Sequence, residues 1–257
     1  MDEYLEELRN NVLKFKAEKL KKYKDDIFDT PAYNAELKYL KSMTFDFIHV
    51  LQSISIYSTR AVHIYDNFLT IRVIDELLES AIGILSLVNG GTHNMVKREM
   101  RYLVELVTKY VIIDYELMGK KFEDKVKYLK TDIPNSSIEV ISRYNPPFGD
   151  AISVQFRNEV KDYFYKACSY VHPSSSQLTE RIENQEKGIT IGFETTKMLH
   201  DMNKVIFRGY DMILLMIFHG FGHSMGKDIF EQLLIDDIKW KFHNGKYIKH
   251  LKVTYRL

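Results

Sequence analysis

The stretch VIFRGYDMILLMIFHGF, residues 205–221, is the most apolar run in the chain, and it decides the fold class. It is too short for a bilayer-spanning helix, and it is interrupted by Arg208 and Asp211. The run therefore predicts a helix buried in a protein core. It forms the second half of a longer helix expected over about residues 194–221.

Apolar residues recur at helical spacing outside this run as well. Only 5 prolines and 12 glycines interrupt the 257 residues, and Asn89-Gly90-Gly91 is a strong helix-stop signal. We expect a mainly α protein, a bundle of about eight helices. Longer helices are predicted near residues 2–25, 33–59, 66–87, 92–118, 153–172 and 194–221, and shorter ones near 120–131, 138–144 and 174–185.

The last segment has a different pattern. Apolar and basic residues alternate around Asn244-Gly245, a pair that favours the left-handed conformations of a tight turn. This pattern predicts a small C-terminal β-hairpin over 236–257, attached to a helical domain over 1–235. The lysines of the hairpin would form a solvated edge or a binding strip.

The overall charge argues against a global attraction to polyanions. Lys and Arg number 36 and Asp and Glu 35, which leaves a formal net charge of +1. Binding to nucleic acid would therefore depend on a local basic patch, and we expect no binding to membranes.

The only cysteine, Cys168, excludes an intrachain disulfide and a metal site built from cysteines. A single cysteine is typical of a reducing compartment. The first residues, MDEYLEE, are acidic and amphipathic, unlike a signal peptide. A cytoplasmic location is the expectation.

Arg101 and Glu105 are four residues apart on the polar face of the helix predicted over 92–118. At that spacing their side chains can touch. A surface ion pair of this kind contributes only a few tenths of a kcal/mol. The alternative is that the pair forms part of a site.

His172 ends the helix predicted over 153–172, because Pro173 stops it. The imidazole lies away from the apolar stripe of this helix. It could cap the helix C-terminus, or act as a general acid or base near neutral pH. Ser174 and Ser175 could cap the following turn or bind a phosphate.

Two motifs, RYLVE at residues 101–105 and SYVHPS at residues 169–174, resemble prokaryotic proteins related to the HEPN superfamily. These proteins often occur in antiviral defence and abortive infection. The resemblance covers about residues 92–185. It implies a helical homodimer, or a subunit of a complex, that cuts RNA without a metal or another cofactor.

HEPN ribonucleases typically carry an arginine that four to six intervening residues separate from the histidine. Here the residue six positions before His172 is Lys166, and the nearest preceding arginine is Arg157. Lysine can neutralise a phosphate but lacks the bidentate geometry of arginine. Either Arg101 supplies the arginine from the neighbouring helix, or this chain is not a nuclease.

The resemblance implies a cleavage in which the 2′-hydroxyl of RNA attacks the adjacent phosphorus. His172 would move the proton, and Arg101 or Lys166 would stabilise the transition-state charge. Glu105 would orient Arg101 or His172. Four residues would contact the RNA substrate: Lys166, Ser169, Tyr170 and Ser174.

The sequence leaves a second reading open, a non-catalytic helical scaffold or partner-binding subunit of a defence or regulatory assembly. Arg101, Glu105 and His172 would then form a buried polar network. His219 and His223 have the spacing of a two-histidine metal face, but no carboxylate or cysteine nearby completes such a site, and we expect no metal.

Overall fold

The computed structural model describes residues 2–59, 67–171, 174–186, 194–221, 228, 230–232 and 239–256. This part of the chain is all α-helical, as the periodicity predicted, and contains ten helices of seven or more residues where about eight were expected. They are α1 (Asp2–Tyr23), α2 (Pro31–Ser58), α5 (Ile74–Asn89), α6 (His93–Glu116), α7 (Phe122–Thr131), α8 (Ser137–Arg143), α9 (Asp150–Cys168), α10 (Ser175–Glu186), α11 (Thr196–Gly220) and α13 (Lys246–Tyr255). The described residues also form three short helical turns: the π-helix η1 (Lys24–Phe28), α4 (Leu69–Arg72) and the 3-10 helix η2 (Lys241–Asn244).

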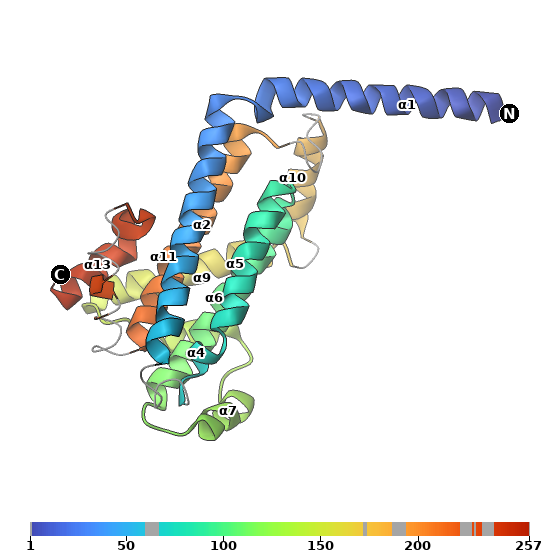
Figure 1. Cartoon of the computed structure of the whole chain (residues 1–257). Helices are drawn as coiled ribbons and strands as arrows, with labels where there is room; N and C mark the ends of the chain where they lie inside the picture. Colours follow the sequence, from blue (N-terminus) through green and yellow to red (C-terminus); the bar gives the residue numbers. More distant parts are fainter. Residues whose placement is uncertain are drawn as a thin grey trace.

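Four of these helices form a bundle in which each packs against two others. α11 contacts α2 and α6, and α5 contacts the same two helices from the other side. α9 crosses the bundle and packs on α6, while α13 packs on α11 (Figure 1). α1 projects away from the bundle near the start of α2.

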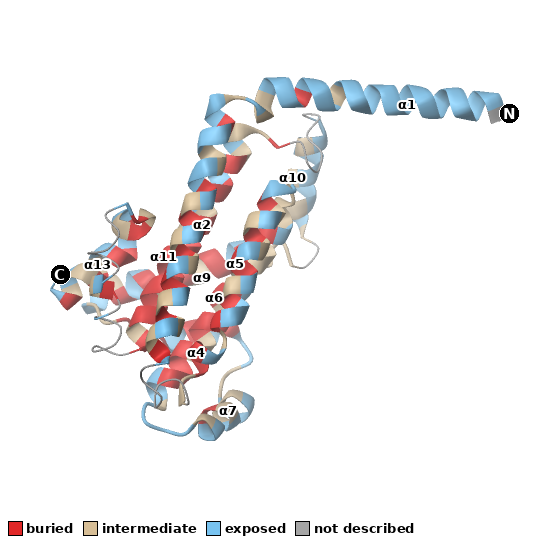
Figure 2. Ribbon diagram, viewed as in Figure 1, coloured by how far each residue is buried: buried red, intermediate tan, exposed pale blue. Residues whose placement is uncertain are grey.

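The apolar run at residues 205–221 is a buried helix, as predicted. Every residue of α11 from Gly209 to Phe218 is buried, and buried residues of α11 and the neighbouring helices form one hydrophobic cluster (Figure 2). A helix that is apolar on all sides has to be covered on all sides. Gly209 permits this close packing, because a Cβ there would lie 2.1 Å from Cε of Met100 and 2.6 Å from the hydroxyl of Tyr163.

None of the described helices combines the length and hydropathy that a bilayer-spanning segment needs.

The predicted C-terminal β-hairpin is wrong. Residues 241–244 form η2 and residues 246–255 form α13. Gly245 has φ −56° and ψ 139°, outside the left-handed region that a hairpin turn would use. The apolar residues of α13 that are buried, Tyr247, Ile248, Leu251 and Tyr255, recur at helical spacing and join the common core.

Carboxylates of distant helices, rather than a tight turn, fix the conformation of this segment. The backbone N–H groups of Tyr247 and Ile248 donate to Asp211 of α11 at 2.9 and 3.2 Å. The N–H of Lys241 donates to Asp46 of α2 at 2.7 Å. The free N–H groups at a helix N-terminus require such acceptors, and a carboxylate also complements the helix dipole.

Asp211 should make the stability of the fold depend on pH. Burial raises the pKa of the Asp211 carboxyl to about 6, although hydrogen bonds from Tyr247, Ile248 and Lys246 oppose the shift. Between about pH 4 and 6 the folded state then holds a proton that the unfolded state has released. The free energy of unfolding that Asp211 contributes therefore falls as the pH rises through this window. A pKa raised from 3.8 to about 6 corresponds to a total loss of roughly 3 kcal/mol.

We predict that the stability of the parent relative to Asp211→Asn falls as the pH rises from 4 to 7. Urea unfolding of both proteins at several pH values measures the difference, in which the other titrating groups cancel. A difference that stays constant, or grows with pH, would contradict this assignment.

Candidate functional site

A cavity of about 560 Å³ lies where the end of α9 meets α6 and α11. Four cationic side chains line it. They are Lys97 of α6, Lys166 of α9, and Lys204 and Arg208 of α11; the remaining lining residues are Tyr163, Ala167, Ser169, Tyr170 and Val205. Among the described residues no carboxylate lines the cavity. The walls therefore suit an anionic ligand.

Lys97 is the least exposed of the four cations that line the cavity. Its side chain is 17% exposed, its Nζ lies 3.3 Å from Oε1 of Glu180, and it lies 3.7 Å from the centre of the Tyr170 ring. Burial lowers the pKa of Lys97, and the negative charge of Glu180 offsets part of that effect. The ammonium is thus held in place by an ion pair and an aromatic face.

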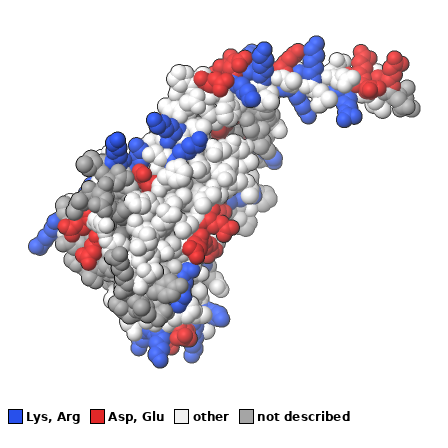
Figure 3. All heavy atoms as spheres, viewed as in Figure 1, with Lys and Arg blue, Asp and Glu red and all other residues white. Residues whose placement is uncertain are grey.

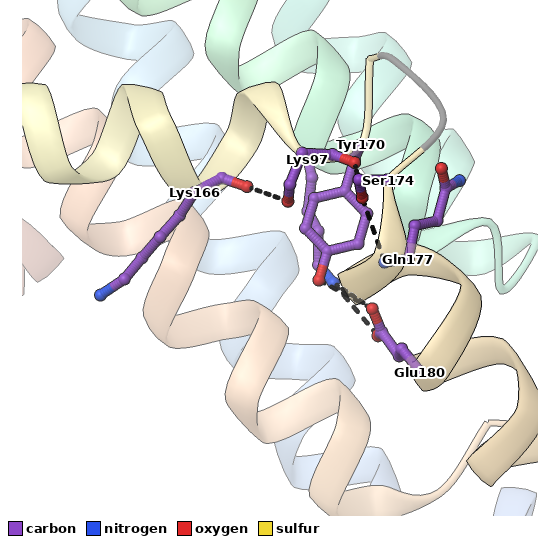
Figure 4. A network of polar contacts seen from close by, with 7 residues as sticks. Lys97, Lys166, Tyr170, Ser174, Gln177 and Glu180 are labelled. Carbon is purple, nitrogen blue, oxygen red and sulfur yellow. Dashed lines mark hydrogen bonds and ion pairs between the residues drawn. The ribbon is translucent and has the colours of Figure 1, made fainter.

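Tyr170 connects this cation to α10. Its hydroxyl donates to Glu180 at 2.7 Å, and burial followed by this hydrogen bond raises the pKa of Tyr170. Figure 4 shows Lys97 and Glu180 converging on Tyr170, whereas the Lys166 side chain extends away from them. Tyr170 is also held through its backbone carbonyl, which accepts a hydrogen bond from Nε of Arg98.

The other three cations are more exposed and have carboxylates beside them. Lys166 lies 3.0 Å from Asp162 and is 72% exposed, and Lys204 lies 3.9 Å from Asp201. Arg208 lies 3.6 Å from Glu159 and 3.7 Å from Asp162. These ion pairs at partly exposed positions are weak, so a phosphate could compete for the cations.

Three of the four residues predicted to contact RNA line this cavity, namely Lys166, Ser169 and Tyr170. Ser169 donates to the carbonyl of Lys166 at 2.7 Å. Ser174, the fourth, donates to the carbonyl of Ser169 at 2.6 Å and accepts from the N–H of Gln177 at 3.2 Å. Ser174 therefore caps α10, which confirms the capping reading; its contact with a phosphate stays a prediction.

The predicted pair of Arg101 and Glu105 is present on α6, with NH2 of Arg101 3.3 Å from Oε2 of Glu105. Nε of Arg101 donates to Sγ of Cys168 at 3.1 Å, and the guanidinium lies 4.6 Å from the centre of the Phe164 ring. These contacts dock the guanidinium on α9, and Arg101 is not among the residues that line the cavity.

Glu105 is the centre of a small ionic network. It also pairs with Lys109 at 2.8 Å. Burial raises the pKa of Glu105, but hydrogen bonds from Lys109 and Ser137 and the charges of Lys109 and Arg101 outweigh it, so the pKa lies below the ordinary value. Glu105 is therefore an ionised anchor for Arg101.

His172, the predicted proton-transfer group, lies outside the described residues together with Pro173. The predicted juxtaposition of His172 and Arg101 therefore stays a prediction. The sequence reasoning missed Lys97, Lys204 and Arg208 as lining residues. Lys204 and Arg208 could have been found from their i, i+4 spacing, which puts two cations on one face of the helix.

Of the two histidines with metal-ligand spacing, His223 lies outside the described residues. His219 Nδ1 lies 2.9 Å from the hydroxyl of Tyr144, and burial lowers the pKa of His219 to about 4. Among the described residues no group of three or more potential metal ligands is present.

A second polar cluster, which the sequence did not indicate, lies around the buried Glu194. Its carboxylate contacts the hydroxyl of Tyr33 and Nε2 of His93, and its carbonyl accepts from Tyr23 at 2.7 Å. These residues come from the starts of α2 and α6, the end of α1 and the residue pair before α11. The cluster joins four segments, and its polar groups contact one another.

No protein-family model, curated protein or solved structure significantly matches this chain.

The cavity geometry predicts that Glu180→Gln lowers the pKa of Lys97 further, because burial remains while the compensating negative charge is removed. A pH titration of the lysine side-chain signals by NMR measures the change. Glu186→Gln, at an exposed position of the same helix, is the matched control. An unchanged Lys97 titration in Glu180→Gln would contradict the ion pair.

Proposed function

We propose that this chain is a HEPN-like defence protein that binds RNA phosphates in the basic cavity at the end of α9, and that it cleaves the bound RNA. The observation that carries the proposal is the convergence of Lys97, Lys166, Lys204 and Arg208 on one cavity. Phosphate neutralisation by lysine and arginine supplies most of the sequence-independent affinity for nucleic acids.

The chemistry would take place next to the residues that bind phosphate. His172 follows Tyr170 by two positions in the chain. The 2′-hydroxyl would attack the neighbouring phosphorus as the bond to the 5′-oxygen breaks, which leaves a 2′,3′-cyclic phosphate and a free 5′-hydroxyl. His172 would accept the proton of the 2′-hydroxyl or donate one to the departing 5′-oxygen.

In this scheme the cavity cations, rather than Arg101, stabilise the charge on the phosphorus oxygens. Arg101 and Glu105 act as positioning residues, because the guanidinium is held by Glu105 and contacts Cys168 and Phe164 of α9. This division of roles accounts for the lysine at position 166, where HEPN ribonucleases place an arginine.

The ionic network around Glu105 favours a second function. The side chains around Glu105 are paired with one another, as expected for a polar cluster that sets the register of α6 against α8 and α9. A non-catalytic scaffold or partner-binding subunit of a defence or regulatory assembly would need only this arrangement. Cleavage of RNA distinguishes the two functions.

We predict that Lys204→Ala/Arg208→Ala weakens the binding of a fluorescently labelled single-stranded RNA by roughly tenfold. The slope of log affinity against log salt should fall by roughly 1.4, because each lost phosphate contact on a single strand contributes about 0.7. Lys38→Ala/Lys41→Ala removes the same charge from exposed positions of α2 and serves as the control. Equal weakening by both double variants would exclude the cavity as the binding site.

We predict that the purified protein cleaves RNA in the presence of EDTA, and that His172→Ala abolishes this cleavage while retaining RNA binding. Gel analysis of end-labelled RNA measures the cleavage, and mapping of the termini identifies the fragment with the 2′,3′-cyclic phosphate and the fragment with the 5′-hydroxyl. Equal cleavage by parent and variant, or cleavage by neither, would defeat the nuclease proposal and leave the scaffold.

A further inference from the structure

Positive charge is concentrated near the C-terminal end of the chain. Residues 239–256 contain six lysines and arginines and no aspartate or glutamate. The whole chain has a formal net charge of +1, so the residues outside this segment carry a net charge of −5. Figure 3 shows acidic and basic side chains interspersed on the face of the molecule that it views. A segment with charges of only one sign is the exception, and a basic cluster of this kind is typical of surfaces that bind polyanions.

The lysines of α13 share the side of the helix that faces away from the core. At about 100° per residue, Lys246, Lys249 and Lys252 lie within an arc of about 120°. The buried apolar residues of α13 lie on the other side of the helix. Lys246 and Lys249 are exposed and Lys252 is half-buried. These three lysines, which we call the lysine face, are therefore accessible to a ligand.

Two lysines of the lysine face have no carboxylate partner among the described residues, namely Lys249 and Lys252. Nζ of Lys252 lies 3.2 Å from Nδ1 of His243. Burial lowers the pKa of Lys252, and the charge of Lys249 lowers it further. Like charges on successive turns of a helix destabilise it. A bound anion would offset this repulsion.

The lysine face adjoins the basic cavity. Arg208 lines the cavity and lies 3.6 Å from Glu159, and the same carboxylate contacts Lys246. Asp211, three residues after Arg208 on α11, accepts hydrogen bonds from two N–H groups at the start of α13 and so fixes that start beside it. The cations therefore form one row that runs from Lys204 through Arg208 to α13.

The carboxylates at the junction of the cavity and α13 do not reverse the sign of this row. Three cations meet two carboxylates there, namely Lys166, Arg208 and Lys246 against Asp162 and Glu159. Beyond the junction the lysine face adds only positive charge. The row is therefore net positive from the cavity to the far part of α13.

From this continuity we infer that a single-stranded RNA bound in the cavity continues across α13, where the lysine face binds its next phosphates. The inference rests on the proposed function, because the cavity supplies the first phosphate contacts. The 10 residues of α13 span about 15 Å, so only an RNA that extends beyond the cavity reaches the whole lysine face. An anionic membrane is planar and could not enter the cavity. Contacts to phosphates add affinity without selecting a base sequence.

Isothermal titration calorimetry with two RNA probes tests the inference. One probe is a 5′-phosphorylated dinucleotide, which is short enough to bind in the cavity alone, and the other is a single-stranded RNA of about 15 nucleotides. Lys249→Ala/Lys252→Ala should weaken binding of the long RNA by roughly tenfold and lower its salt slope by about 1.4, and should leave dinucleotide binding unchanged. Lys127→Ala/Lys130→Ala removes two exposed lysines with the same spacing from α7 and should leave the binding of both probes unchanged.

A charge-conserving variant separates charge from folding. Lys249→Arg/Lys252→Arg should bind the long RNA like the parent. The inference is overturned by unchanged long-RNA binding in the alanine variant, by equal loss in the α7 control, by equal weakening of both probes, or by a loss of binding confined to phosphatidylserine vesicles. Failure of the proposed function has a different signature. The dinucleotide would then not bind, or Lys204→Ala/Arg208→Ala would leave its affinity unchanged, whereas the effect of the lysine face on the long RNA is measured separately.

Discussion

The burial of α11 is the constraint on which the rest of the structure depends. A helix that presents Met212, Leu214, Leu215 and Met216 to its surroundings with no exposed surface has to be enclosed by other elements. α2 and α6 cover it along the bundle, and α13 covers it from outside. At Gly209 the enclosure is close enough that no side chain fits between α11 and its neighbours.

Enclosure of α11 brings carboxylates within reach of backbone N–H groups that have no acceptor within their own helix. Asp211 accepts from two N–H groups of α13, and Asp46 accepts from the N–H of Lys241. Asp114 of α6 does the same for α4, where it accepts from the N–H groups of Leu69 and Thr70 at 2.9 and 2.8 Å. Each carboxylate anchors the start of a short helix to the bundle.

The site at Asp114 is fully buried together with its counter-ion. Nζ of Lys125 lies 2.9 Å from Asp114, both side chains are 0% exposed, and the ammonium also lies 4.3 Å from the centre of the Phe68 ring. A buried ion pair offsets its desolvation cost only when additional hydrogen bonds are made. The N–H groups of α4 supply them, so the pairing fixes α4 and α7 with respect to α6.

The same bundle creates the cavity that we propose to bind RNA. The cations of α11 lie near Lys97 of α6 because α6 and α11 pack against each other, and the end of α9 adds Lys166 to the same cavity. The ion pair of Lys97 with Glu180 then ties α10 to this junction. Binding of a phosphate would therefore compete with contacts that position α10.

The sequence alone determined the helical class, the buried helix at residues 205–221, the pairing of Arg101 with Glu105 and the cap at Ser174. These features depend on hydrophobic periodicity or on residues within a few positions of each other. The tertiary structure decided the conformation after Trp240, because the acceptors for its N–H groups lie 36 to 195 residues earlier in the chain. It also decided which cations share a cavity, since crossing of helices far apart in the sequence leaves no periodic signal.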